Sequence, residues 1–416
     1  MKILNVNKYF YHKAGAETYY FELNDLLESH GHKVIHFSMK DPHNLASPYE
    51  KYFVSNINYE TQTKFYQKVR NALKIIYSFE ASRKLKRLLQ AEQPDLVHIQ
   101  NFHHQLSPSI LRVIEKFGIP VVYTAHDLKL VCPNYKMLAD GQICERCKQG
   151  TYSSCVKLKC VKDSRISSFV NMIEMTLAKK MNIIRKIDTI IVPSLFYKQK
   201  LSEWGIDERK LVYIPNFIDC SKDTTDSTHK NYFIYFGRLA EEKGIMTLLK
   251  AMEHVKKAEL YILGSGPLQE VIQKEIKSNS QLSSKVQLLG FKSGEELHTL
   301  LRQSMFNVLP SEWYENGPYS VLEMMCIGKP TIAANIGGLP DMIQDRKTGL
   351  LFKSGDSQDL ARKINELLED EELLQQLGEN CRQCVLQRHS QDAYYRRLMK
   401  VYKVVLRKKG RKDERK

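Results

Sequence analysis

Two carboxylates stand close together in a segment that is expected to run from a strand through a loop into a helix. The segment is Leu309–Met325, with Glu315 in the loop and Glu323 inside a helix that should begin at Pro318. A helix N-terminus binds anions, whereas a carboxylate repels phosphate and accepts hydrogen bonds from hydroxyl groups instead. The pattern favours a ligand rich in both phosphate and hydroxyl groups. The alternative is that the two glutamates are surface charges around a plain loop.

Two cations follow another expected strand. Arg238 and Lys243 come after the apolar run Tyr232–Phe236, and the carboxyl ends of parallel strands form the ligand crevice of open α/β sheets. An arginine fork and a lysine charge in that crevice could clamp a diphosphate and offset its developing charge as it leaves. The alternative is a solvated loop.

Short β-rich runs alternate with amphipathic stretches along the whole chain, which predicts an α/β architecture with parallel sheets. The expected strands of the first half are Ile3–Val6, Val34–Phe37, Leu96–Ile99, Val121–Thr124 and Thr189–Val192. Those of the second half are Tyr232–Phe236, Leu260–Leu263, Val286–Leu289, Asn307–Leu309, Thr331–Ala333 and Leu350–Phe352. The two series predict one domain at residues 1–200 and another at 201–390.

The composition sets further limits on the function. The chain has 416 residues and a net charge of +16, which favours anionic partners such as nucleic acid, anionic lipid or phosphate-bearing substrates. No run approaches the ~18 consecutive apolar residues of a membrane span, and the N-terminus begins as a strand without a signal peptide. We therefore expect a cytoplasmic protein.

The ordered set of motifs resembles glycosyltransferase family 4, whose members are retaining enzymes of the GT-B fold. The motifs are Gly-Arg-Leu at 237–239, Lys-Gly at 243–244, Leu-Gly-Ser-Gly-Pro at 263–267, Glu-x7-Glu at 315–323 and Gly-Lys-Pro at 328–330. The resemblance runs from residue 1 to about 405. It implies two Rossmann-like domains facing a cleft, with a nucleotide-diphosphate sugar as the donor of a hexose-type sugar.

The resemblance also implies roles for individual residues. The implied catalytic residues are His126, Arg238, Lys243 and Glu315. The implied donor-binding residues are Gly15, Gly264, Ser265, Gly266, Pro267, Phe291, Asn316, Gly317 and Glu323. Arg238 and Lys243 would bind the pyrophosphate and Glu323 the ribose, while Glu315 would contact the transferred sugar. The turns at 264–267 and 290–291 would frame the base.

Two departures from the family pattern stand out. Ala14 replaces the first of two usual glycines in the loop before Gly15, and Gly317-Pro318 replaces a usual Phe-Gly pair. Pro318 has no N–H, so a main-chain hydrogen bond to the sugar from that position is missing. The resemblance implies that the departing diphosphate takes the acceptor's proton. The chain also has no Asp-x-Asp motif, which would hold a metal bridging the diphosphate. We therefore expect catalysis to need no metal cofactor.

Five of the nine cysteines crowd into an insertion at about 132–160. Four of them could supply thiolates to a structural zinc site in a reducing compartment, namely Cys144, Cys147, Cys155 and Cys160. Free or redox-labile thiols are the alternative. Some members of glycosyltransferase family 4 carry a comparable insertion, and the resemblance suggests a loop on the side of the cleft where the acceptor binds.

Basic amphipathic stretches at Lys64–Arg87 and Lys179–Lys186 suit helices lying on an anionic membrane surface, and equally suit ordinary surface helices. A final helix at about 391–407, with Ser390 as its N-cap, is expected to pack back on the first domain. The basic run at 407–412 after it is either a solvated tail or a membrane contact. A glycan or lipid-linked acceptor is expected on these grounds.

Three other functions remain open. A nucleic-acid-binding protein would explain the charge, but no base-reading or stacking motif occurs, so no nucleic-acid partner is expected. Another GT-B enzyme, such as a nucleotide-sugar epimerase, would act on the donor without an acceptor. A non-catalytic scaffold at the membrane is the third alternative.

Overall fold

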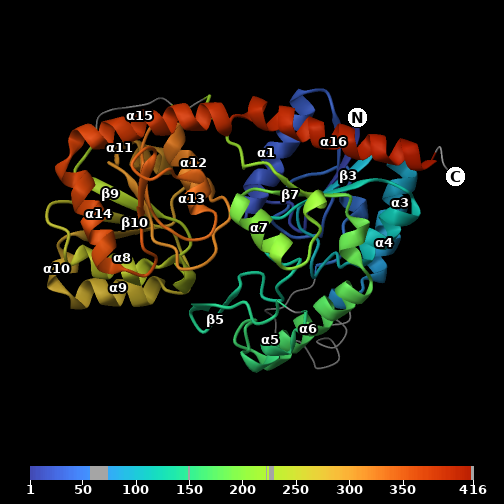
Figure 1. Ribbon diagram of the computed structural model, residues 1–416, viewed down its shortest axis with the longest axis horizontal. Helices are drawn as coiled ribbons and strands as arrows, with labels where there is room; N and C mark the ends of the chain where they lie inside the picture. The colour runs from blue at the N-terminus through green and yellow to red at the C-terminus, as the bar shows by residue number, and fades with distance from the viewer. Residues whose placement is uncertain (57–73, 149, 222, 224–228, 414–416) are drawn as a thin grey trace. The chain divides into compact units, whose positions relative to one another are not determined.

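The computed structural model describes residues 1–56, 74–148, 150–221, 223 and 229–413 (Figure 1). The chain divides into two compact units. The first comprises Met1–Asp140, Cys144–Ile214 and Tyr394–Lys416, and the second comprises Gly141–Ile143 and Pro215–Ala393. The first unit extends to Ile214 rather than to about residue 200, because Leu211–Tyr213 adds an unpredicted edge strand to its sheet.

The first unit is built on a six-stranded parallel sheet with the strand order β2-β1-β3-β4-β7-β8. The strands are β1 (Lys2–Val6), β2 (Lys33–Phe37), β3 (Leu96–Ile99), β4 (Val121–Thr124), β7 (Thr189–Val192) and β8 (Leu211–Tyr213). The helices are α1 (Gly15–Ser29), α3 (Phe79–Glu92), α4 (Ser109–Lys116), α5 (Ser153–Lys157), α6 (Arg165–Lys180) and α7 (Leu195–Glu203). Strands β3, β4 and β7 are buried at every position, as their apolar sequences predicted.

The second unit has its own six-stranded parallel sheet, with the order β11-β10-β9-β12-β13-β14. The strands are β9 (Tyr232–Phe236), β10 (Glu259–Leu263), β11 (Val286–Gly290), β12 (Asn307–Leu309), β13 (Thr331–Ala334) and β14 (Gly349–Phe352). The helices are α8 (Ile245–Met252), α9 (Gln269–Ser278), α10 (Ser280–Ser283), α11 (Gly294–Gln303), α12 (Tyr319–Cys326), α13 (Leu339–Met342), α14 (Ser357–Glu369) and α15 (Glu371–Arg388). This is the Rossmann strand order.

In both sheets the strand order reverses at one point. The reversal lies between β1 and β3 in the first unit and between β9 and β12 in the second. Neighbouring loops leave the sheet in opposite directions there, which opens a crevice at the carboxyl ends of the strands. Each unit therefore has one place where a ligand site is expected.

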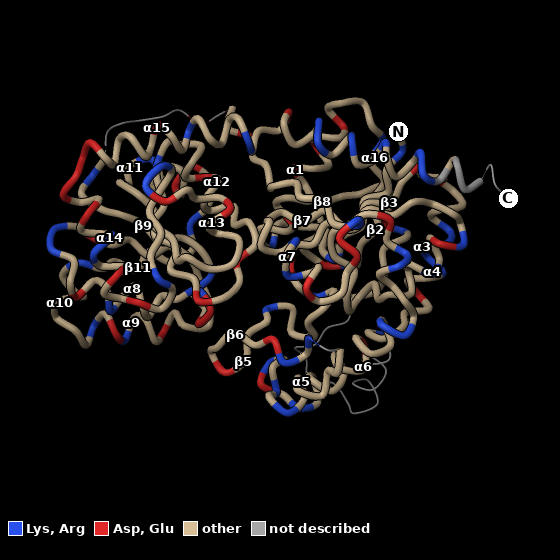
Figure 2. The backbone as a smooth tube through the Cα atoms, in the orientation of Figure 1, with Lys and Arg blue, Asp and Glu red and all other residues tan. Residues whose placement is uncertain are grey.

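The last helix, α16 (Gln391–Asp413), packs on the first unit from Tyr394 onward, as was expected of the final helix. The hydroxyl of Tyr402 lies 2.7 Å from His98 Nδ1 on β3, and the hydroxyls of Tyr394 and Tyr19 are hydrogen-bonded. The helix continues through the basic run that was expected to follow it as a tail. Figure 2 shows Lys and Arg segments along α3 and the C-terminal part of α16.

Candidate active site

The strongest cluster of predicted site residues lies at the switch point of the second unit. Lys243 follows β9 and Glu315 follows β12, and Lys243 Nζ donates to Glu315 Oε1 at 2.6 Å. Ser311 donates to the same oxygen at 2.6 Å. The carboxylate is 6% exposed and the lysine side chain 19%, so this is a largely buried ion pair. A cation held in this crevice is available to a phosphate that can displace the carboxylate.

The loops after β9 and β12 are brought together by a close backbone approach. Gly244 adopts φ +66°, and a Cβ added there would lie 1.8 Å from the Pro310 carbonyl oxygen. Only glycine fits such a contact. The Glu312 N–H also donates to the Glu242 carbonyl at 2.9 Å. The glycine of the Lys-Gly motif thus keeps Lys243 within reach of Glu315.

Arg238, the second predicted cation, is much more exposed than Lys243. Its side chain is 57% exposed, and its closest carboxylate contact is 3.9 Å from Nη1 to Glu242 Oε1. An exposed guanidinium at the end of β9 can turn toward a phosphate at little structural cost. The two predicted clamp cations therefore lie on one loop, one held in a buried ion pair and one exposed.

Glu323 lies on α12, the helix that follows the Glu315 loop. Pro318 immediately precedes its first residue, and Gly328, with φ +70°, follows its end. Burial, together with a smaller contribution from the nearby Asp223 carboxylate, raises the pKa of Glu323 to about 7. A desolvated carboxyl group of this kind accepts hydroxyl hydrogen bonds strongly when it is ionised.

The residues expected to frame the base also lie together. The Gly264 N–H donates to the Gly290 carbonyl at 2.8 Å, which joins the turns that follow β10 and β11. Gly264 has φ +134°, and a Cβ there would lie 1.8 Å from the Gly237 carbonyl oxygen. Ser265 and Pro267 are exposed, Gly266 is half-buried and Phe291 is 72% exposed. The ring of Phe291 is thus available for stacking against a flat ligand.

Asn316 and Gly317 lie between Glu315 and α12, and both are half-buried. The Gly317 carbonyl accepts a hydrogen bond from Asn216 Nδ2 at 2.8 Å. Sequence reasoning missed Asn216 and Ser311. The position of Ser311, directly after the end of β12 and Pro310, was the one available signal for it.

The two predicted site residues of the first unit lie after β1 and β4. Gly15 is exposed and is the first residue of α1. His126 Nε2 lies 3.1 Å from Gln100 Oε1, and burial lowers the pKa of His126 to about 3. The imidazole is therefore neutral at pH 7 and can exchange hydrogen bonds with a polar ligand.

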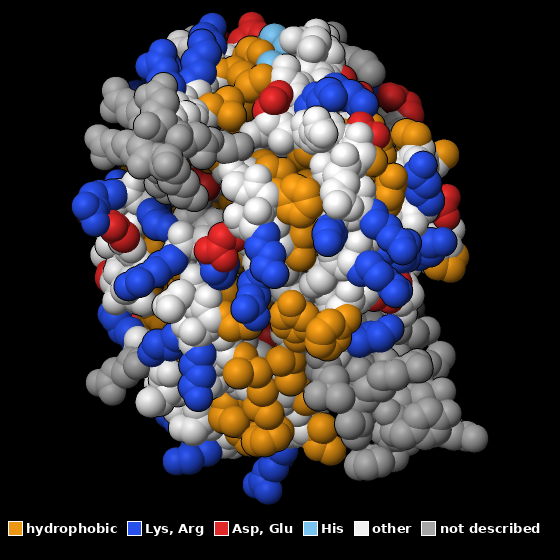
Figure 3. All heavy atoms as spheres, turned by 90° about the vertical axis from the view of Figure 1, so that its right-hand side faces the viewer, with side chains coloured by type: hydrophobic (Ala, Val, Ile, Leu, Met, Phe, Trp, Pro, Cys, Tyr) orange, Lys and Arg blue, Asp and Glu red, His pale blue; other side chains and the backbone are white. Residues whose placement is uncertain are grey.

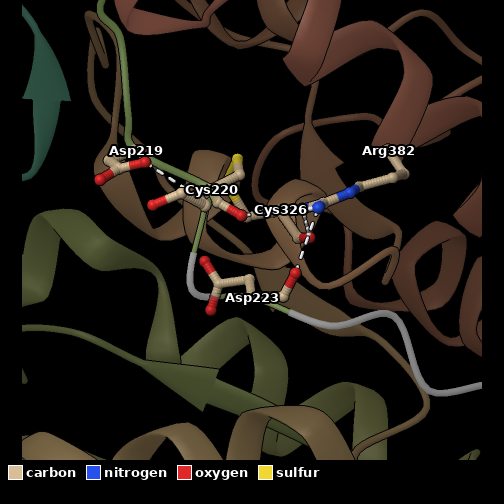
Figure 4. The surroundings of a disulfide bond; sticks show 6 residues. Asp219, Cys220, Asp223, Cys326 and Arg382 are labelled. Carbon is tan, nitrogen blue, oxygen red and sulfur yellow. Dashed lines mark hydrogen bonds between the residues drawn. A yellow bond between two sulfur atoms is a disulfide. The ribbon is translucent and has the colours of Figure 1, made fainter.

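A disulfide that was not predicted lies close behind the second-unit site. Cys220 and Cys326 are bonded across a sequence separation of 106 residues (Figure 4). Cys326 ends α12, three residues beyond Glu323. The Arg382 guanidinium from α15 donates to the carbonyls of Cys326 and Asp223. The bond and the arginine together hold Cys220 and Asp223 near the helix that carries Glu323.

The cysteine-rich insertion brings its cysteines together in one cluster. One cavity is lined by five cysteines, namely Cys132, Cys144, Cys147, Cys155 and Cys160. Across the described ranges no three His, Cys, Asp or Glu side chains are arranged to hold a metal ion. The sulfurs of Cys155 and Cys160 are 3.0 Å apart, closer than the roughly 3.8 Å between thiolates bound tetrahedrally to zinc at about 2.3 Å. The arrangement fits the alternative of free thiols.

Comparison with known proteins places the chain in a family. Residues 14–222 match the family described as Glycosyltransferase Family 4, and residues 219–384 match Glycosyl transferases group 1. The chain belongs to glycosyltransferase family 4. The family resemblance expected from the motifs is thereby confirmed.

This family 4 chain is similar to several curated proteins over part of its length. It is 32% identical over 193 residues to a glycosyltransferase of Methanocaldococcus jannaschii, covering 46% of this chain and 53% of the relative. It is 28% identical over 205 residues to the N-acetyl-alpha-D-glucosaminyl L-malate synthase of Bacillus anthracis, covering 49% and 52%. The chain thus spans about half the length of these relatives.

Solved structures agree in fold over nearly the whole family 4 chain. The sucrose-phosphate synthase of Thermosynechococcus elongatus has a TM-score of 0.71 at 19% identity, covering 97% of this chain and 99% of that one. HepE of Anabaena in complex with UDP-glucose has a TM-score of 0.68 at 17% identity, covering 97% and 100%. The GT-B fold class expected from the sequence is confirmed. Among the described helices, none is long and apolar enough to cross a bilayer.

Proposed function

We propose that this protein transfers a hexose-type sugar from a nucleotide-diphosphate sugar to a glycan or lipid-linked acceptor, with retention of the anomeric configuration. The observation that carries the proposal is the Lys243–Glu315 ion pair, 2.6 Å long, at the switch point of the second-unit sheet. A cation and a carboxylate in one crevice match a ligand with phosphate and hydroxyl groups side by side.

Each residue has a distinct part in this proposal. Lys243 and Arg238 hold the diphosphate and stabilise the charge that it gains as its bond to the sugar breaks. Glu315, released from Lys243, binds the transferred sugar, and Glu323 binds the ribose hydroxyls. The diphosphate oxygen takes the acceptor's proton, so this scheme requires no protein base and no metal cofactor.

A thermal-shift series with UDP, GDP, ADP and inorganic phosphate tests the proposal. UDP is the first candidate, because HepE has been solved in complex with UDP and with UDP-glucose. A ligand at 100 times its Kd should stabilise the fold by about 2.7 kcal/mol. Arg238→Ala should lose the shift, while Arg346→Ala, whose side chain is also 57% exposed, should keep it. No shift with any nucleotide would refute the proposed donor.

The products separate transfer from its alternatives. An epimerase or hydrolase would consume the nucleotide sugar without an acceptor, whereas a transferase needs one. The anomeric proton coupling in the NMR spectrum of the product reports whether the configuration is retained. Undiminished transfer in EDTA is expected, and loss that Mg²⁺ restores would contradict a metal-independent reaction.

We further propose that the protein is cytoplasmic and binds an anionic membrane surface, where a lipid-linked acceptor would be found. On α3, Phe79 is 79% exposed beside the exposed Arg83, Lys86 and Arg87. On α6, Ile166 is 78% exposed. In the stretch Lys64–Arg87, residues 64–73 lie outside the described residues. Figure 3 shows hydrophobic side chains bordered by Lys and Arg on one face.

Basic helices with exposed apolar side chains bind anionic headgroups. Co-sedimentation with phosphatidylglycerol vesicles, but not with phosphatidylcholine vesicles, is the expected result. A Phe79→Ser variant should bind the anionic vesicles less well. Equal recovery of the protein in the pellet with both lipids would contradict the proposed binding to anionic membranes.

A further inference from the structure

A group of buried charged side chains lies in the first unit, outside the residues assigned above. Glu174 on α6 is 1% exposed, and its Oε2 lies 2.9 Å from Nζ of Lys129, which follows β4. The loop after β3 brings His103 Nδ1 to 3.7 Å and His104 Nδ1 to 3.8 Å from the same carboxylate. Four ionisable groups thus meet at the carboxyl edge of the sheet.

The position of this group is the one that the topology marks for a ligand. The strand order of the first sheet reverses between β1 and β3, and the two histidines follow β3 directly. In open α/β sheets the crevice beside such a reversal is the place where ligands bind.

The hydrogen bonding within the group is incomplete. Within the described part of the chain, the His103 ring nitrogens have no hydrogen bond of good geometry, and Glu174 is met by the 2.9 Å ion pair with Lys129 and by the longer contacts with the two histidines. His103 and Glu174 are 3% and 1% exposed. Buried polar atoms are normally paired, so unmet ones point to a missing hydrogen-bonding partner.

His104 is the histidine of this group that a ligand can reach. Its side chain is 26% exposed, and its backbone has a left-handed φ of +70°. A non-glycine residue in that region is strained, and such strain is often found at functional sites. Burial lowers the pKa of His104 to about 3, so the ring is neutral at pH 7. The carboxylate beside Nδ1 favours the proton on that nitrogen, which leaves Nε2 as an acceptor.

We propose that His104, oriented by Glu174, accepts a hydrogen bond from a sugar hydroxyl of the acceptor and so forms part of an acceptor site in the first unit. The inference rests on the proposed transferase function, because it assigns that reaction's second substrate. Lys129 neutralises Glu174 and keeps the carboxylate ionised beneath the histidine. The chemical class of the ligand is a polyhydroxylated ring, because a neutral imidazole nitrogen accepts from hydroxyl groups and does not attract an anion.

The test uses the full chain labelled with ¹³C at histidine Cε1. The probes are methyl α- and β-glycosides of glucose, galactose, mannose and N-acetylglucosamine, each titrated separately. At least one glycoside should shift the His104 resonance. His104→Ala should weaken the binding of that glycoside about tenfold, as expected for the loss of one hydrogen bond worth about 1.4 kcal/mol. His104→Gln, whose amide oxygen still accepts, should retain part of the affinity.

The controls separate binding from folding. His43→Ala removes a histidine of the same unit that is 77% exposed, and should leave glycoside affinity unchanged. Glu174→Gln should weaken glycoside binding less than His104→Ala does, provided that the circular dichroism spectrum of the Glu174→Gln variant matches that of wild type. If Glu174→Gln fails to fold, the His104 variants decide the outcome.

The inference is overturned if no glycoside shifts the His104 resonance. It is also overturned if His104→Ala lowers thermal stability without changing glycoside affinity, which is the behaviour of a purely structural residue. The thermal shift with UDP is measured in parallel on every variant. Glycoside binding without any UDP shift would count against the transferase function and leave the saccharide site standing.

Discussion

Replacing Glu315 with glutamine should tighten the binding of a nucleoside diphosphate while it reduces sugar transfer. In the structure Lys243 Nζ is held by Glu315 Oε1 at 2.6 Å, so a diphosphate must displace the carboxylate to reach this cation. The amide keeps the shape of the side chain and a donor–acceptor pair but removes the charge. The substitution therefore removes the carboxylate that competes with the diphosphate for Lys243. It also removes the repulsion between that carboxylate and the phosphates.

The size of the effect follows from the geometry of the pair. At an effective dielectric constant of about 20, opposite unit charges at this separation attract by about 6 kcal/mol. Desolvation of both groups offsets most of that attraction, because they are largely buried. If roughly a quarter remains, the release of Lys243 is worth about 1.4 kcal/mol, or tenfold in Kd. Transfer should still fall, since the proposed contact of Glu315 with the sugar is weakened.

Isothermal titration calorimetry with UDP measures the affinity, and release of UDP from the donor measures transfer. Glu312→Gln is the matched control. Glu312 lies in the same loop and makes the same charge change on substitution, but its carboxylate accepts from Thr247 Oγ1 at 2.5 Å rather than from Lys243. The control should leave UDP affinity within about twofold of wild type.

Weaker or unchanged UDP binding in Glu315→Gln, beside an unchanged control, would refute this reasoning. It would mean that Lys243 is a structural partner of Glu315 and that the diphosphate is held elsewhere. Urea denaturation of the same variants shows whether a loss of stability accounts for the result.

Three other predictions concern the same unit. Arg238→Ala should cost about 2–4 kcal/mol of transition-state stabilisation with an unchanged Tm, because the side chain is 57% exposed; equal kcat/KM would contradict its role. Cys220→Ser should lower the free energy of unfolding by about 4–5 kcal/mol, since the bond to Cys326 closes a loop of 106 residues, and wild type in reductant should match it in urea titrations. Burial raises the pKa of Glu323 from 4.5 to about 7, so the folded state holds a proton that the unfolded chain releases at lower pH. Wild type should therefore lose about 3 kcal/mol relative to Glu323→Gln between pH 4.5 and 7, and parallel pH–stability curves would argue against that shift.

Much of the sheet structure was predictable from single runs of residues. Val121–Thr124 and Thr189–Val192 have the predicted bounds because a strand covered on both faces is apolar at every position. Leu211–Tyr213 was missed. It is a three-residue edge strand that is half-buried at two positions, and so short a run carries no clear pattern. Its pairing with β7 moved the end of the first unit to Ile214.

The site was predictable as a set of residue types but not as a set of partners. The motifs named Lys243 and Glu315, which are 72 residues apart in the chain. Their contact depends on β12 pairing beside β9 rather than beside β11, and no local pattern specifies that order. The cysteine cluster shows the same limit. Cysteine spacing reports which sulfurs can meet but not the distance at which they settle.

By itself the sequence determined where strands run, which loops carry cations and carboxylates, and to which family the chain belongs. Those properties follow from local composition and from the order of motifs. The tertiary structure alone decided that Cys220 meets Cys326 and that His104 lies beside Glu174. Such pairs are chosen by strand order and helix packing over long separations, because the free energy that selects them comes from burial of whole elements rather than from neighbouring residues.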